Sequence, residues 1–230
     1  MRCIKYLGLL ALSCSAMAAS DDWRGCYVGV HGGSAEVDSS YRGVFFVGDV
    51  INDDLGTVSG DGEFFGAQVG CRMLVSDNWV LGLRLSGSDG DTNARHPYIN
   101  GTSPTNYVSY DADSLVTLSG QFGFLLSEAS LLYVNIGYGQ IDMLVEDTDP
   151  NYQEPIYFQH KDTLDDVMVG VGFEYRFNAN WSVFAEYNQI DFGTERNVLL
   201  TDLSTWDIDD YQADIGHEMD FFKLGVNFQF

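Results

Sequence analysis

Residues 164–177 read LDDVMVGVGFEYRF, and from Val167 onward every second residue is large and apolar. The apolar positions are Val167, Val169, Val171, Phe173, Tyr175 and Phe177, and the positions between them are Met168, Gly170, Gly172, Glu174 and Arg176. A period of two predicts a β-strand with one apolar face. Glycines and charges on the other face would make a poor soluble core, whereas a membrane barrel turns its apolar face to lipid and its polar face inward.

Seven other segments show strand-like patterns, and none of the eight has the period of an amphipathic helix. The eight predicted strands are residues 23–37, 64–75, 79–88, 114–126, 131–144, 164–177, 181–192 and 219–230. The last one, FFKLGVNFQF, ends the chain on Phe230 and alternates Phe222 and Leu224 with Lys223 and Gly225.

The connections between these segments alternate strictly between short and long. Residues 76–78, 127–130 and 178–180 are tight turns, whereas 38–63, 89–113, 145–163 and 193–218 are long and acidic. This alternation is typical of a membrane barrel with short periplasmic turns and long outer loops. We therefore predict an all-β fold: an eight-stranded antiparallel up-and-down transmembrane β-barrel with four long acidic extracellular loops.

Three tryptophans open predicted strands at the periplasmic end: Trp23, Trp79 and Trp181. Aromatic side chains gather at membrane interfaces, so the sequence predicts that these three form a girdle.

The strand alternation also places charged residues inside the barrel. The inward set is Arg72, Arg84, Glu174, Arg176, Glu186 and Lys223. Buried charges must be paired, so we predict an ion-pair network in which the two glutamates meet some of the cations. Such a network serves either as a structural plug or as a narrow conduction path.

Cysteine usage and the N-terminus indicate export. Residues 1–19 have early cations, a short apolar run and Ala16-Met17-Ala18, which predicts a signal peptide cleaved after Ala18 or Ala19 and a barrel domain at 20–230. Of the four cysteines, Cys26 and Cys71 lie outside this segment, on outward faces near the periplasmic end of neighbouring predicted strands. They form either a cross-strand disulfide or two apolar thiols.

Composition excludes two classes of protein. The formal net charge is −23, and removing residues 1–19 takes away Arg2 and Lys5 and no acid, which leaves −25. Such a chain is not expected to bind nucleic acid. A mean hydropathy of −0.08 excludes a helical membrane bundle but is compatible with alternating barrel strands.

The hairpin GVGFEYRFNANWSVFAEYNQIDFG (170–193) resembles the C-terminal region of small proteobacterial outer-membrane barrels of the OmpA-like and opacity-type surface-antigen group. GCYVGVHGG (25–33), GAQVGCRM (66–73), NWVLGL (78–83) and the terminal Phe230 add to this resemblance. It implies a barrel in the outer membrane of a Gram-negative bacterium, surrounded by lipid and inserted by the barrel assembly machinery, with Phe230 as part of the insertion signal. Members of this group act as surface antigens, adhesins, membrane stabilisers or narrow pores.

The segments DVINDD (49–54), EDTDPNYQE (146–154) and DIDDYQAD (207–214) combine acids with aromatic residues, which favours a cationic or protein partner, or serves only to keep the loops hydrated. We expect a monomeric surface protein, structural or adhesin-like, that contacts a host or cell-surface protein through its loops. A narrow porin is the first alternative and a lipid-modifying enzyme the second. No catalytic motif, cofactor site or metal site is evident, since Asp207, Asp209, Asp210 and Asp214 lack the EF-hand spacing.

Overall fold

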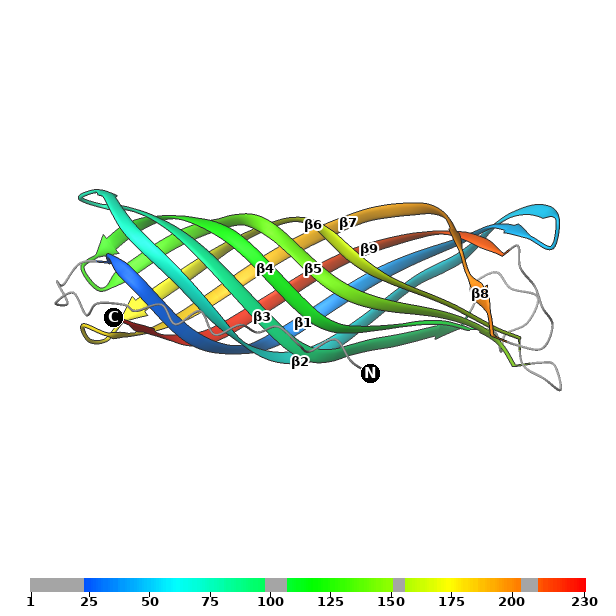
Figure 1. Cartoon of the computed structure of the whole chain (residues 1–230), viewed down its shortest axis with the longest axis horizontal. Helices are drawn as coiled ribbons and strands as arrows, with labels where there is room; N and C mark the ends of the chain where they lie inside the picture. The colour runs from blue at the N-terminus through cyan, green and yellow to red at the C-terminus, as the bar shows by residue number, and fades with distance from the viewer. Residues whose placement is uncertain (1–22, 98–106, 151–155, 204–210) are drawn as a thin grey trace, which may run out of the picture.

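The computed structural model describes residues 23–97, 107–150, 156–203 and 211–230, and within them the chain forms an antiparallel sheet that closes on itself. Eight long strands pair in the order β5-β4-β3-β2-β1-β9-β7-β6, and a β5–β6 pairing completes the ring. The first and last long strands, β1 (Gly25–Phe46) and β9 (Gln212–Gln229), are hydrogen-bonded neighbours, blue and red in Figure 1. The predicted eight-stranded up-and-down barrel is confirmed.

The other strands follow in chain order around the wall. They are β2 (Asp49–Ser76), β3 (Trp79–Pro97), β4 (Tyr107–Ser127), β5 (Ser130–Asp149), β6 (Ile156–Arg176), β7 (Trp181–Leu199) and the two-residue β8 (Thr201–Asp202). Tight turns and the C-terminus lie at one end of the elongated barrel, and β8 lies toward the other (Figure 1). Within the described ranges, no helix is long and apolar enough to cross a membrane.

The strands continue far into the segments that we expected to be loops. Residues 38–63 form a hairpin whose two-residue turn, Val47–Gly48, has positive φ angles of 49° and 82°. Two consecutive positive φ angles are typical of a type I′ hairpin turn. The other three predicted loops are also largely strand where they are described, and the central residues 98–106, 151–155 and 204–210 lie outside the described residues.

Apolar and polar residues continue to alternate in these segments, which is why they form strands. The apolar residues, however, now face the inside of the barrel and the polar residues face outward. On β1, Val28 and Val30 are exposed on the outside of the barrel, but farther along the strand the outward positions become Ser34 and Glu36. The inward residues there are apolar and buried, as at Val37. A transmembrane strand needs about 9–11 residues, and β2 has 28. The barrel therefore extends beyond the membrane as a wall that is polar outside and apolar inside.

Inward-facing glycines make room for large rings inside this narrow barrel. A Cβ on Gly172 would lie 2.3 Å from the ring of Tyr133, and a Cβ on Gly225 would lie 2.4 Å from the ring of Phe184. An eight-stranded barrel has an interior about wide enough for side chains. Each glycine thus allows a bulky ring from a neighbouring strand to fill the lumen.

Two of the three predicted girdle tryptophans lie on the outer surface beside the tight turns. Trp79 is 40% exposed and Trp181 is 43% exposed. The Trp79 ring stacks on Phe122 with centroids 4.7 Å apart, and Trp181 packs against Phe228 at 5.0 Å. Trp79 and Trp181 are the first residues of β3 and β7 and directly follow tight turns.

The prediction for Trp23 is wrong, because its side chain lies inside the barrel and is only 2% exposed. Its Nε1 donates to the backbone oxygen of Glu128 at 3.1 Å, and the Arg176 guanidinium lies 4.4 Å from its ring centroid. The alternation of β1 accounts for this position, since Tyr27 points inward and Trp23 is four residues earlier. Trp23 therefore lies inside the barrel, at the end that carries the tight turns.

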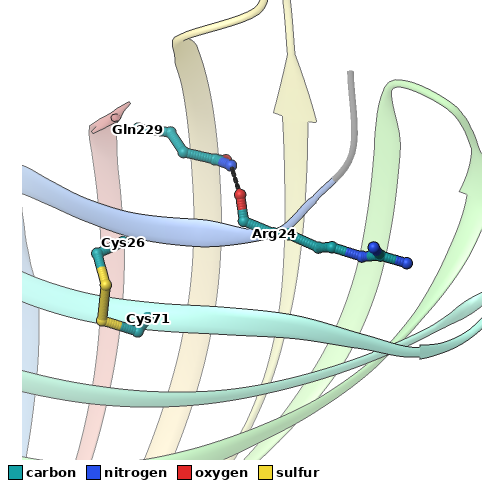
Figure 2. Close-up of a disulfide and its surroundings, with 4 residues drawn as sticks. All are labelled: Arg24, Cys26, Cys71 and Gln229. Carbon is teal, nitrogen blue, oxygen red and sulfur yellow. Dashed lines mark hydrogen bonds between the residues drawn. A yellow bond between two sulfur atoms is a disulfide. The ribbon is translucent and has the colours of Figure 1, made fainter. Parts of the chain in front are cut away.

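Cys26 and Cys71 form a disulfide on the outer surface. They are direct cross-strand partners on β1 and β2, with Cα atoms 3.9 Å apart. Figure 2 shows the bridge close to the start of β1, where Gln229 Nε2 donates to the backbone oxygen of Arg24 at 2.5 Å. The disulfide and this hydrogen bond connect β1 to both of its neighbours at the same end of the barrel.

We expect the mature protein, unfolded without reductant, to expose no reactive thiol, and to expose two after reduction. The reason is that the β1–β2 ladder holds the two cysteines side by side in an oxidising compartment. A thiol-reactive chromophore in denaturant measures the count, and a Cys26→Ser/Cys71→Ser variant provides the baseline. Two reactive groups before reduction would show that the bridge does not form.

Candidate functional site

Two buried ion pairs cross the lumen at the level of the lipid-facing band. Arg72 donates to both carboxylate oxygens of Glu174, at 3.0 and 2.6 Å. Arg84 donates to Glu186 at 2.5 Å, and the Tyr133 hydroxyl donates to the other oxygen of Glu186 at 2.9 Å. Both predicted glutamates thus meet an arginine on the far side of the barrel, and charge-assisted bonds of this kind are among the stronger hydrogen bonds in proteins.

A chain of amide side chains links the two ion pairs. Arg72 Nε donates to Gln121 at 3.4 Å, Gln121 donates to Asn135 at 3.3 Å, and Asn135 donates to Asn188 at 3.3 Å. Asn188 then donates to Glu186 at 2.9 Å. The membrane-level lumen is therefore crossed by a continuous hydrogen-bonded network.

The other two predicted lumen cations lie at the ends of this network. Arg176, beside Trp23, donates to Gln229 at 3.2 Å. Lys223 donates to Ser86 at 3.4 Å and lies 4.9 Å from the ring centroid of Phe221, where the polar lumen meets apolar side chains. The structure thus places all six predicted charges inside the barrel, and the pairs Arg72–Glu174 and Arg84–Glu186 join four of them.

Above the charged network, an apolar core fills the extracellular half of the lumen. Near its outer end, the ring of Tyr211 packs against Phe158 and Phe46, with centroids 4.8 and 5.5 Å away. A hollow of about 20 Å³ within the core has space for about one water. Buried members of this core include Val37, Tyr41, Val108, Tyr110, Ile141, Met143, Met168, Ile190, Ile215 and Phe221.

The outer surface of the same extension carries two rows of carboxylates. Cross-strand neighbours in the first row are Asp61, Glu36 and Asp220, and in the second Asp38, Glu218 and Asp191. We call these six residues the acidic wall. Like charges directly opposite each other in a sheet are destabilising. The acidic wall begins at Asp220, the next outward-facing residue of β9 after the lipid-facing Phe222, and it spans β2, β1, β9 and β7.

The negative potential of the acidic wall reaches the interior. The pKa of Tyr110 is raised, first by burial and then by the carboxylates of Asp38, Asp61 and Glu36. Its hydroxyl stays protonated and donates to the backbone oxygen of Val37 at 2.6 Å. The wall is thus a concentrated anionic surface held on a packed, hydrogen-bonded scaffold.

Comparisons with known proteins agree with this geometry. The family described as outer membrane protein beta-barrel domain matches residues 7–230. The chain belongs to this family.

Members of the outer membrane β-barrel family lie in the outer membrane of Gram-negative bacteria, and this localisation extends to the present chain. An uncharacterized protein of Coxiella burnetii is 24% identical over 216 residues, covering 89% of this chain and 83% of that protein. Among solved structures, the outer membrane protease OmpT of Escherichia coli has a TM-score of 0.58 at 11% identity, covering 94% of this chain and 99% of OmpT. OprG of Pseudomonas aeruginosa has a TM-score of 0.54 at 13% identity, covering 91% and 98%. These two likenesses concern the fold alone.

One serine–histidine pair lies within the extension of this outer-membrane barrel. Ser39 Oγ is 2.7 Å from His217 Nδ1, and burial lowers the pKa of His217 to about 4, with His160 acting in the same direction. Ser39 has no exposed surface. A nucleophile must reach its substrate, and the Ser39 side chain has no surface at which a substrate could meet it. His31, in the lumen, bonds Gln68 and Ser88 instead.

The sequence analysis did not predict the acidic wall, because most of its residues lie in or beside segments that we assigned to loops, where they alternate with apolar residues. The signal that identifies it is the continuing period of two, as in Glu36-Val37-Asp38. Of the acidic segments noted in the sequence, residues 49–54 form the start of β2. In the segment 207–214, the ring of Tyr211 is buried in the apolar core and is therefore not available to a protein partner. Asp207, Asp209 and Asp210 lie outside the described residues.

Proposed function

We propose that this outer-membrane barrel is a closed, adhesin-like surface protein that binds a cationic face of a protein partner through the acidic wall. The alignment of three carboxylates across neighbouring strands, twice in succession, supports this function. Such rows repel internally, and lysine or arginine side chains of a partner would relieve the repulsion. Complementary charge raises association rates and selects partners.

The route to the membrane belongs to the same proposal. Residues 1–19 act as the cleaved signal peptide, leaving a barrel domain from residue 20 that functions as a monomer. Phe230 is 42% exposed on the outer face of the closing strand, a position accessible to an assembly factor. We assign Phe230 to the insertion signal on this basis.

The filled lumen favours a plug over the narrow porin. A conducting path would have to pass the two buried ion pairs and then the apolar core, and transfer of an ion into such a core is strongly unfavourable. The lipid-modifying alternative would require an accessible nucleophile, and in the Ser39–His217 pair the Ser39 side chain is buried. We therefore retain a binding function rather than a catalytic one.

A binding experiment with matched charge variants tests this function. The refolded mature barrel is titrated with a fluorescent lysine-rich peptide at two salt concentrations. The variant Glu36→Gln/Asp61→Asn/Asp220→Asn removes one row, and we expect binding to weaken roughly tenfold, because salt-sensitive charge pairs are lost.

The control variant, Asp142→Asn/Glu146→Gln/Asp165→Asn, changes the net charge equally on β5 and β6. We expect it to weaken binding by less than about twofold, since it leaves the wall intact. Equal loss in the two variants would mean that only overall charge matters and would refute a localised binding surface.

A further inference from the structure

The barrel wall has a seam between β6 and β7 in the extracellular half. The β6–β7 ladder runs from Arg176 paired with Ser182 to Met168 paired with Ile190. Farther out, β6 pairs instead with β8, at Phe158 and Gln159. In the described part of β6, residues 160–167 have no ladder partner on this side, so side chains rather than backbone bonds must hold the two strands together there.

Two bulges turn one carboxylate of β7 toward this seam. The β7–β9 register shifts between Asp191 and Thr194, and again between Glu195 and Val198. The first shift pairs Glu195 with the inward-facing Ile215, whereas an unbroken alternation from Ile190 would place Glu195 on the outer face. Bulges commonly re-aim a side chain at a functional position. Here they direct a carboxylate to the inner side of the wall.

Glu195 meets two metal-ligating side chains of β6. One ligand atom each from His160, Asp162 and Glu195 lies within 4.8 Å of the others. His160 and Asp162 are two residues apart on one strand, so they share a face. A tetrahedral ion with bonds of about 2.1 Å holds its ligand atoms about 3.4 Å apart, which small side-chain rotations achieve here.

The two carboxylates of this trio are in electrostatic conflict. One carboxylate oxygen of Asp162 and one of Glu195 lie within 4.8 Å of each other, so their negative charges repel. A cation bound between the two carboxylates would balance these charges. A cation between β6 and β7 would also join the strands across the seam.

We propose that His160, Asp162 and Glu195 form a site for a divalent first-row transition metal, with Zn²⁺ as the best match. One imidazole and two carboxylates suit Zn²⁺, whereas Mg²⁺ and Ca²⁺ require a larger set of oxygen ligands. Three protein ligands leave one position for water. The bound ion pins β6 to β7 where the ladder is interrupted.

Calorimetric titration of the tag-free, refolded mature barrel with ZnCl₂ tests the site. We expect one saturable equivalent that a large excess of MgCl₂ does not displace. His160→Gln should weaken Zn²⁺ binding by at least roughly tenfold, since the nitrogen ligand is lost. Co²⁺ in place of Zn²⁺ should give a visible absorption band that is absent from the same variant.

The control is Glu218→Gln, which removes a carboxylate of the acidic wall and should leave Zn²⁺ affinity unchanged. Heat-modified gel migration checks that each variant folds, and Glu195→Gln replaces His160→Gln if the latter does not. The proposal is overturned by absence of saturable Zn²⁺ binding, by equal affinity in the ligand variant and the native sequence, or by a loss that occurs in Glu218→Gln instead.

Discussion

Glu174→Gln is expected to lower the free energy of unfolding of the barrel by about 3–5 kcal/mol, the usual effect of removing one partner of a buried ion pair. The substitution keeps the size of the side chain but leaves the Arg72 guanidinium buried without its counter-charge. It also weakens the bond that Asn227 donates to Glu174 at 3.2 Å. Urea titration in phospholipid vesicles, followed by heat-modified gel migration, measures the change.

Two further variants separate the loss of charge from general damage. Glu63→Gln changes an exposed carboxylate on the outer face of β2 and should shift stability by no more than about 0.5 kcal/mol. Arg72→Met/Glu174→Leu removes both charges and should recover much of the loss. The plug interpretation would be abandoned if Glu174→Gln kept its stability while single-channel conductance in a planar bilayer changed.

Phe221→Ala should cost about 3–5 kcal/mol, because it opens a cavity in the apolar core that surrounding side chains refill only in part. Phe221 is 1% exposed, and its ring packs edge-on against Phe64 with centroids 6.2 Å apart. The same urea titration measures this loss.

The neighbouring residue provides the matched control. Phe222 is 41% exposed on the outer face, so Phe222→Ala should cost only about 2 kcal/mol, because lipid fills the vacated space and no cavity remains. If the two substitutions cost the same, the extracellular half of the lumen would not be a packed core.

Local pattern was enough to predict the strands and their pairing. Alternation over Val167–Phe177 identifies a strand with opposite faces, and the tight turns at 76–78, 127–130 and 178–180 impose antiparallel neighbours. The same alternation places the six charges inward and puts Cys26 and Cys71 outward on neighbouring strands, but it left open whether the two thiols are joined, which the structure decides. For Trp23, position at the start of a predicted strand gave the wrong orientation. Its side chain points inward because it lies an even number of residues from the inward-facing Tyr27.

The extended wall was missed because acidic residues at alternate positions were interpreted as loops. In the membrane the outward residues of a strand are apolar, and beyond the membrane they are polar. The inward residues change in the opposite sense: on β2 they are Gln68 and Arg72 at the membrane level and Val58 beyond it. Recognising this requires knowledge of where the membrane ends along each strand.

The sequence by itself determined the barrel, its strand order and the side on which residues of the membrane-level strands lie, because all three depend on a period of two and on short turns between neighbours. Only the tertiary structure decided which charges pair across the lumen, how far the wall rises above the membrane, and that His160, Asp162 and Glu195 meet. Closure of the ring brings residues from distant strands together, and bulges change the face on which a residue lies. Neither effect can be read from a local sequence pattern.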